Sequence, residues 1–320
     1  MARPKPTVIE HRTYYLPMQF PVLLLSGDYW KISDIPSERL HFHNCLEIGL
    51  CHSESGTLEI CGQKHYYKEG DITVIPKNVP HTTYSSPGKE SHWSYLFIEP
   101  KLLFRNILPA VWENIDLNID EFRGYQHIFN KDSYPYIHFL MTNIIRELET
   151  KPPSYHISVR GLLLSLYIEI YRLLAEANTN SANEQEDPDS PANNALVIAP
   201  ALDYIEENYM NSFTIDQLAD LCHWSPTHFR RIFYSIMGVL PLDYVNTTRI
   251  MRSCDLLQST ELSILEISEM VGFHTLSSYN RHFTKLIQMS PREYRNHMKQ
   301  LDKRTEKQVI LEYTGWLYPE

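Results

Sequence analysis

Three histidines and one carboxylate stand at spacings that suggest a shared site. His41, His43 and Glu47 form the pattern H-x-H-x-x-x-E within the segment HFHNCLE, and His81 comes later, at the end of a segment that contains two prolines. In a β-strand, residues i and i+2 face the same side, so we expect His41 and His43 to point together. Sets of imidazole and carboxylate groups suit Fe, Mn, Ni or Zn. These residue types allow two interpretations, a metal-dependent pocket or a polar barrel mouth without a metal.

A second kind of chemistry is indicated in the last third of the chain, where one segment occurs twice. Residues 215–233 are repeated by residues 264–283, with an offset of 49 before an internal turn and 50 after it. Each copy has the pattern of a short helix, a tight turn and a second helix, which is the helix-turn-helix arrangement. Capping boxes at Thr214 and Ser263 mark where the first helix of each copy begins.

The second helix of each copy divides into an apolar stripe and a polar face. The residues expected to face inward are Phe229, Ile232, Phe233 and Ile236 in the first copy and Tyr279, His282, Phe283 and Leu286 in the second. The exposed candidates for contact with base edges are Thr227, Arg230, Arg231, Leu276, Ser277, Asn280 and Arg281. One such helix pair would fit a helical domain with a solvated arginine face. Two in tandem, with arginine at the same place in both, favour binding to double-stranded DNA.

Residues 196–300 resemble the arabinose-regulator (AraC/XylS) family of bacterial transcription factors. The family signature I-A-x-x-V-G-F, S-x-F-x-R-x-F-K-K, G-x-x-P and Y-R matches residues 267–295. The chain departs from it at Ser268, Tyr279, Thr284 and Gln288; the last replaces a glycine that stops the helix, so the following turn could differ. By this resemblance, both reading helices enter the major groove about one DNA turn, roughly 34 Å, apart.

The histidine segments resemble the two short motifs of the cupin barrel, with Asn78 where the second motif usually has glycine. In metal-binding cupins the four positions described above are the ligands. Regulators of the AraC type, however, usually carry a cupin-like sensor for a small effector, often a sugar, and most do without a metal. We therefore expect an effector pocket with no metal or other cofactor. Its candidate residues are His41, His43, Glu47, His81, Trp93 and Tyr95. The alternative is a cupin metalloenzyme, such as a sugar isomerase or dioxygenase, with a DNA-binding tail.

The elements that must position these residues follow from hydrophobic patterning. Before residue 101, short apolar runs at 22–25, 46–50, 58–61, 72–75 and 95–98 predict strands of a small antiparallel barrel or jelly roll. Residues 134–174 have helical periodicity in two segments. These helices either cover the open side of the barrel or form a dimer seam.

The predicted fold class is α+β with several domains. A cupin-like effector-binding and dimerisation domain is expected over residues 1–175 and a double helix-turn-helix DNA-binding domain over residues 195–300. Residues 176–194 contain two prolines and no large apolar residue, which predicts a flexible linker. Residues 301–320 form a C-terminal tail whose role the pattern does not indicate.

The amino-acid composition excludes several classes of protein. The 320 residues have 43% hydrophobic content and five cysteines without a C-x-x-C pair, which argues against a disulfide framework. No run approaches the ~18 apolar residues of a membrane span, and no secretion signal is visible, so we expect a cytoplasmic protein and no membrane partner. The net charge of -10 is unevenly spread, since residues 225–304 carry 11 Lys+Arg and 7 Asp+Glu.

The expected function is a non-enzymatic, effector-controlled transcription regulator that binds promoter half-sites. By the same resemblance it acts as a homodimer, often as an activator that contacts RNA polymerase.

Overall fold

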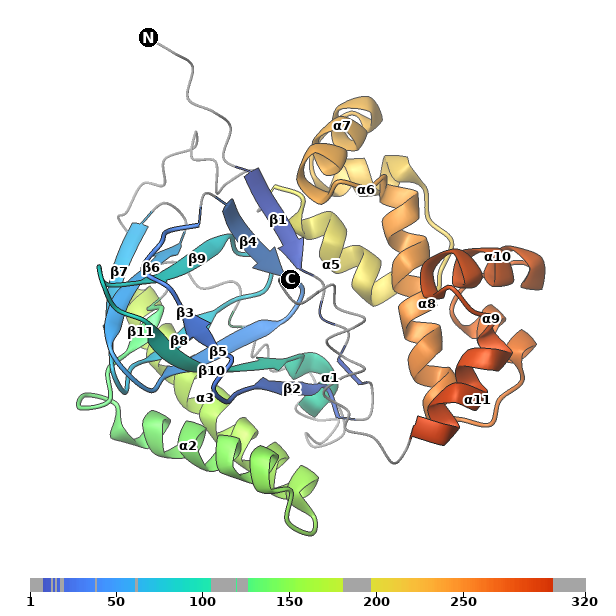
Figure 1. Cartoon of the computed structure of the whole chain (residues 1–320). Coiled ribbons are helices and arrows are strands. Elements are labelled where there is room, and N and C mark those ends of the chain that lie inside the picture. The colour runs from blue at the N-terminus through green and yellow to red at the C-terminus, as the bar shows by residue number, and fades with distance from the viewer. Residues whose placement is uncertain are drawn as a thin grey trace. The chain divides into compact units, whose positions relative to one another are not determined.

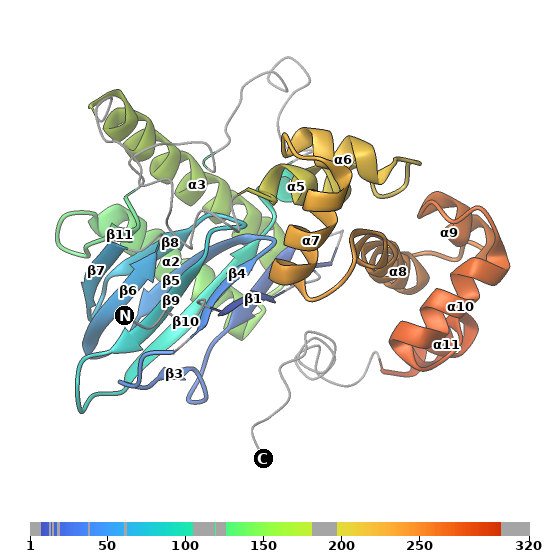
Figure 2. The same ribbon diagram turned by 90° about the horizontal axis from the view of Figure 1, so that it is seen from above.

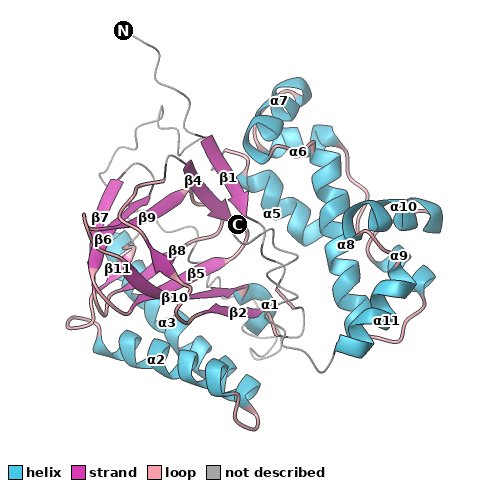
Figure 3. Ribbon diagram, viewed as in Figure 1, coloured by secondary structure: helices cyan, strands magenta, loops and turns pink. Residues whose placement is uncertain are grey.

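The chain divides into two units, Met1–Asn193 and Asn194–Glu320, in the computed structural model shown in Figure 1. The structure describes residues 8–12, 14, 16–17, 20–37, 39–60, 63–104, 119, 126–180 and 197–301. Figure 3 shows strands with a few helices in the first unit and helices throughout the described part of the second. This confirms the predicted α+β class. Among the described residues, no helix is both long enough and apolar enough to cross a membrane.

The first unit is built on two sheets. Its strands are β1 (Val8–Arg12), β2 (Val22–Leu25), β3 (Lys31–Ile32), β4 (Arg39–His43), β5 (Leu46–Cys51), β6 (Ser55–Ile60), β7 (Gln63–Lys68), β8 (Ile72–Ile75), β9 (His81–Ser85), β10 (Ser91–Ile98) and β11 (Ile128–Phe129). One sheet has the order β1-β4-β9-β6-β7, and the other has the order β11-β8-β5-β10-β2, with β3 also paired to β10. The β1–β4 pair is parallel and the other pairs are antiparallel.

Strand β5 is buried along its whole length because both of its faces are covered. Leu46, Ile48 and Leu50 belong to the large core of the unit. Glu47 alternates with them and reaches the histidines of β4 and β9 in the other sheet. Successive strand side chains point to opposite faces. The apolar run is therefore a central strand, and one carboxylate in it points between the sheets.

The helices of the first unit are α1 (Pro100–Phe104), α2 (Pro135–Thr150) and α3 (Tyr155–Asn180). The buried residues of α2 and α3, such as Met141, Ile144 and Leu163, share one core with β5, β8 and β10. Figure 1 shows both helices on one side of the strands. They cover the barrel, as one of the two interpretations predicted. The predicted dimer seam remains a prediction. Ile157, near the start of α3, is 76% exposed.

The expected linker and tail lie largely outside the described residues. Helix α3 continues to Asn180, past the expected linker start at Glu176. Residues 181–196 and 302–320, which include the tail, are not among those described. The boundary between the units, after Asn193, falls at the end of the expected linker.

The second unit contains the two predicted helix-turn-helix pairs. Its helices are α5 (Ala199–Asn208), α6 (Ile215–Leu221), α7 (Pro226–Met237), α8 (Pro241–Ser259), α9 (Ile264–Met270), α10 (Leu276–Ile287) and α11 (Pro291–Leu301). Both predicted capping boxes form, at Thr214 before α6 and Ser263 before α9. Figures 1 and 2 show α8 between the pair α6–α7 and the pair α9–α10.

At three of the departures from the family signature, local contacts show how the substituted residue is accommodated. The hydroxyl of Tyr279 donates to Ser253 Oγ at 3.1 Å in the core, and Ser268 Oγ donates to the Leu265 carbonyl at 2.8 Å. Gln288 adopts a left-handed conformation, with φ of 61°, and its N–H bonds to the Thr284 carbonyl. Gly238 ends α7 in the same way. The turn after α10 thus keeps its form without the glycine.

One predicted core residue is wrong. Leu286 was expected to face inward, but it is 41% exposed, and its neighbour Ile287 is buried at 6% exposure. The buried stripe Tyr279, Phe283, Ile287 follows a four-residue step, whereas Leu286 follows a three-residue step. Both steps fit a helical period of 3.6, so tertiary packing decides between them.

Candidate functional site

The second helix of each pair presents a polar outer face. The buried stripe consists of Phe229, Phe233 and Ile236 in α7 and Tyr279, Phe283 and Ile287 in α10. All seven predicted base-reading residues are exposed: Thr227, Arg230, Arg231, Leu276, Ser277, Asn280 and Arg281. The sequence placed these side chains on the solvent side correctly, and their contact with DNA stays a prediction.

Histidines stand beside the leading arginine on both reading helices. Arg231 Nη2 donates to His228 Nδ1 at 3.2 Å, and Arg281 Nη2 lies 3.5 Å from His282 Nε2. A guanidinium has no acceptor, so the histidine nitrogen must offer a lone pair. His228 was not among the residues predicted from the sequence. Its i, i+3 spacing to Arg231 on a helix is the pattern that indicates the contact.

Two arginines of the second unit serve its fold. Arg249 donates from Nε to the Tyr209 carbonyl at 2.7 Å and from Nη2 to the Asn211 carbonyl at 2.9 Å, which ties α8 to the segment after α5. Arg295 Nη2 donates to the Leu262 carbonyl at 2.6 Å. Two of the arginines that contribute to the positive charge of the second unit therefore bind backbone carbonyl groups within the unit.

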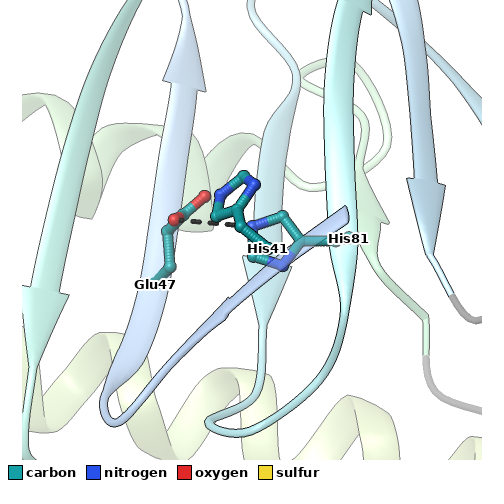
Figure 4. Close-up of side chains that lie close together, drawn as sticks. All are labelled: His41, Glu47 and His81. Atoms are coloured by element: carbon teal, nitrogen blue, oxygen red, sulfur yellow. Dashed lines mark ion pairs between the residues drawn. The ribbon is translucent and has the colours of Figure 1, made fainter. Parts of the chain in front are cut away.

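The first unit gathers the predicted histidines and carboxylate in one cluster. Figure 4 shows His41 from β4, Glu47 from β5 and His81 from β9, and their ligand atoms all lie within 4.8 Å of one another. Glu47 Oε2 is 3.8 Å from His81 Nε2 and 3.0 Å from Nε2 of His43. The four residues predicted from the sequence therefore lie close together, on three strands that belong to both sheets.

Backbone carbonyls hold two of the imidazoles. His43 Nδ1 bonds to the Cys45 carbonyl at 2.8 Å, and His81 Nδ1 bonds to the Val79 carbonyl at 2.9 Å. A carbonyl oxygen only accepts, so Nδ1 carries the hydrogen in both rings. The opposite nitrogens face Glu47: Nε2 of His43 lies 3.0 Å from its Oε2, and Nε2 of His81, at 3.8 Å, has no hydrogen-bond partner within the described part of the chain.

Burial sets the charge state of the cluster. Desolvation lowers the pKa of His81 to about 4 and the pKa of His41 well below its ordinary value. Burial also acts to raise the pKa of Glu47, but contact with His43 and the nearby positive charges outweigh it, so the Glu47 pKa is lowered. At neutral pH the cluster therefore contains an ionised Glu47 carboxylate and neutral imidazoles at His41 and His81.

The turn before β9 shapes the cluster through Asn78. This residue is buried at 4% exposure and has a φ of 62°, and its N–H bonds to the His43 carbonyl at 2.7 Å. Glycine adopts this left-handed conformation most easily, and asparagine is the residue that tolerates it next best. The replacement noted in the sequence is thus compatible with the usual turn.

The predicted aromatic residues lie on the same face as Glu47. The register pairs Phe97 with Glu47 and Tyr95 with Gly49. Trp93 and Tyr95 stack on each other, with ring centroids 5.4 Å apart and planes 7° apart, and Trp93 Nε1 donates to Ser91 Oγ at 2.9 Å. Trp93 is 1% exposed. The pair faces inward and is packed, and its stacking on an effector stays a prediction.

Tyr14 is a neighbour of the cluster that the sequence did not reveal. Its ring stacks on Phe97 at 4.1 Å and meets His43 edge-on at 5.9 Å. Asn44 holds it by two bonds, accepting from Tyr14 N at 2.8 Å and donating to Tyr14 O at 3.1 Å. The contact of Tyr14 with the cluster depends on the parallel pairing of β1 with β4. No local sequence pattern predicts a pairing between segments that are distant in the chain.

Comparison with known proteins matches each unit separately. Residues 35–109 match the family model of the AraC-like ligand binding domain, and residues 218–297 match that of a helix-turn-helix domain. An uncharacterized HTH-type transcriptional regulator of Haemophilus influenzae is 26% identical over 269 residues, which is 79% of this chain and 85% of that protein.

Two further similarities each cover about a third of the chain. YobQ, an uncharacterized HTH-type transcriptional regulator of Bacillus subtilis, is 33% identical over 93 residues, 29% of this chain, and the matched part spans only 39% of that relative's length. A crystal structure of an AraC-type transcriptional regulator from Chromobacterium violaceum has 26% identity and a TM-score of 0.32, covering 34% of this chain and 97% of that one.

The two matched family models occur in the order ligand-binding domain, then helix-turn-helix domain. The first match lies within the strand-rich unit and the second within the helical unit. The chain is therefore similar to AraC-type transcriptional regulators: a region like their ligand-binding domain precedes a region like a helix-turn-helix domain.

Proposed function

We propose that this chain is a sequence-specific DNA-binding regulator of transcription. The observation that carries the proposal is the duplicated reading surface: α7 and α10 each expose arginine beside small polar side chains, over a buried aromatic stripe. Arginine pairs with guanine, asparagine with adenine, and the methyl group of thymine accepts apolar contact. Two such helices allow two successive major-groove contacts.

We propose that the first unit receives a small-molecule effector between its two sheets and that the protein itself is not an enzyme. A polar interior containing Glu47, His43 and His81 gives an effector directional partners, while Trp93 and Tyr95 offer apolar contact. Occupation of this interior would change how the two reading helices engage their half-sites. A sugar fits this mixture of carboxylate, imidazole and aromatic faces.

The proposed working form is a cytoplasmic homodimer that activates transcription by contact with RNA polymerase. The support is the family to which the two matched domains belong. The wide exposed remainder of α3, including Ile157, is available for a second copy in solution, since its other side already covers the barrel.

Selection of binding sites from genomic DNA, followed by gel shifts on the selected sequence, tests the proposal. We expect Arg231→Ala and Arg281→Ala each to weaken specific binding by about 1–3 kcal/mol, roughly 5- to 150-fold in Kd. Arg172→Ala is the matched control, because it removes the same charge from an exposed side chain of the first unit. Unchanged affinity for both reading-helix variants would refute the assignment.

The alternative of a metalloenzyme is favoured by a single observation, the histidine–carboxylate cluster. Metal binding alone does not establish turnover. Substrate conversion by the purified chain that depends on Glu47, together with absent sequence-specific DNA binding, would support the enzyme over the regulator.

A further inference from the structure

We propose that His228 is a positioning residue that holds Arg231 in place for base reading, and that it sets how sharply the first reading helix discriminates between base pairs. This role of His228 rests on the proposed function, in which Arg231 of α7 contacts a base edge. His228 lies three residues before Arg231, so the two side chains share one face of α7. Arg231 Nη2 donates to His228 Nδ1 at 3.2 Å.

The half-buried His228 is itself held by the turn that joins α6 to α7. Its backbone N–H donates to Ser225 Oγ, the cap of α7, at 3.4 Å, which fixes the residue in the first turn of the helix. Its ring meets that of Trp224 edge-on, with centroids 4.9 Å apart and planes at 79°. The N–H of Trp224 donates in turn to the Ala219 carbonyl of α6 at 2.9 Å. The imidazole that accepts from Arg231 is therefore anchored to both helices of the pair.

The imidazole suits this task because it accepts a hydrogen bond without a negative charge. A histidine ring that accepts at Nδ1 carries its hydrogen on Nε2 and is neutral. A carboxylate at the same place would offset the positive charge of Arg231, whereas the neutral ring of His228 leaves that charge available to DNA. A guanidinium has five N–H groups, and the bond to His228 uses one of them. The others remain for the bidentate contact that arginine makes with O6 and N7 of guanine.

Holding Arg231 before DNA arrives lowers the cost of binding. Arginine has a long side chain with many rotamers, and an interface that immobilises such a side chain loses part of the affinity it gains. For one side chain this loss corresponds to about 2- to 12-fold in Kd. The bond to His228 restricts the rotamers of Arg231 in the free protein, so a smaller part of that loss falls on the binding step.

The second reading helix has a different arrangement around its arginine. The repeat places Ser278 of α10 at the position of His228, three residues before Arg281. The imidazole beside Arg281 belongs to the next residue, His282, and its Nε2 lies 3.5 Å from Arg281 Nη2, at the outer limit of a hydrogen bond. His282 packs toward Phe273, with ring centroids 5.8 Å apart. We therefore expect the first helix to discriminate between base pairs more sharply than the second.

Binding of full-length variants to the selected DNA site, and to every single-base-pair variant of that site, tests the role of His228. Arg231→Ala first identifies the base pair that Arg231 reads, because substitution of that pair no longer changes the affinity. His228→Leu keeps an apolar side chain against Trp224 and removes the acceptor. It should weaken binding to the selected site by about 2- to 12-fold and reduce discrimination at that base pair alone. His228→Asn should restore both, because its Oδ1 accepts in place of Nδ1.

Two controls separate positioning from folding. In the Arg231→Ala background, His228→Leu should have no further effect, since the side chain that His228 holds is absent. His138→Leu makes the same exchange in a half-buried histidine of α2 in the first unit, and it should leave DNA affinity unchanged. Circular dichroism checks that each variant is folded, and His228→Ala replaces His228→Leu if the latter does not fold.

Three results would overturn the role of His228: native affinity and discrimination in His228→Leu, an equal loss in the native and Arg231→Ala backgrounds, or no rescue by His228→Asn. If no DNA site is selected, or if Arg231→Ala binds like the native chain, the proposed base reading by Arg231 fails first and His228 has nothing to position. The two failures are distinguishable, because only the first leaves Arg231→Ala impaired in specific binding.

Discussion

Replacing Gly272 by alanine should strongly destabilise the helical unit. Gly272 follows α9 in the turn of the second helix-turn-helix pair, with φ of +89°. A Cβ there would stand 2.5 Å from the Met210 carbonyl oxygen and 2.9 Å from the Met210 carbonyl carbon and Cα. Those atoms are backbone, and the flanking Tyr209 and Asn211 carbonyls are held by Arg249. These Met210 backbone atoms cannot move out of the way as the end of a flexible side chain could.

The expected cost has two parts, and Gly238 separates them. Gly238 ends α7 with φ of +67°, and a Cβ added to it would meet nothing within 4 Å, so Gly238→Ala meets only the left-handed backbone cost of about 1–2 kcal/mol. Gly272→Ala meets that cost and the backbone overlap, for a total of about 3 kcal/mol or more. We expect the Gly272 variant to lose roughly twice as much stability as its control.

Differential scanning calorimetry of the full-length variants measures this difference. For a unit of this size, 1 kcal/mol corresponds to about 4 °C in Tm, so we expect a fall of about 4–8 °C for Gly238→Ala and about 12 °C for Gly272→Ala. The transition of the barrel unit serves as an internal reference. Equal losses in the two variants would refute the close approach of Met210 to the turn.

Three further predictions concern the same unit. Gln288→Gly should raise stability by up to about 1 kcal/mol in calorimetry, because it removes the left-handed strain at φ 61°; a loss would contradict the strain. Ile287→Ala should cost about 2–5 kcal/mol in urea unfolding and Leu286→Ala at most about 0.5, since only the first is buried; the reverse order would contradict the packing. Burial raises the pKa of Asp255 to about 7, above its ordinary 3.8, so stability should fall as pH rises from about 4 to 7. Asp255→Asn should flatten that pH dependence of Tm, and an unaltered profile would count against burial of the carboxyl.

The second unit could be predicted from sequence in unusual detail because its determinants are local. Capping boxes at Thr214 and Ser263 and the duplicated spacing define where helices begin without reference to distant residues. The predictions failed where neighbours in space decide, as at Leu286 and Ile287. A helical period alone cannot distinguish adjacent positions on the last turn of α10.

The sequence predicted which residues form the cluster in the barrel, but it did not predict the residues and hydrogen bonds that surround them. The H-x-H spacing placed His41 and His43 on one strand, and the later motif supplied His81. The position of Tyr14 depends on a parallel strand pair between distant segments, which local pattern does not encode. The hydrogen bonds that fix the histidine rings, such as that to the Cys45 carbonyl, depend on turn geometry as well.

The two helices α7 and α10 of one chain are proposed to read DNA together. A hydroxyl-radical footprint of the full-length protein on its selected site tests it most directly. We expect two protected stretches on one face of the duplex, about one helical turn or 10 base pairs apart, with Arg231→Ala weakening one and Arg281→Ala the other. A single protected stretch, or protection unaltered by either variant, would show that α7 and α10 do not read DNA together.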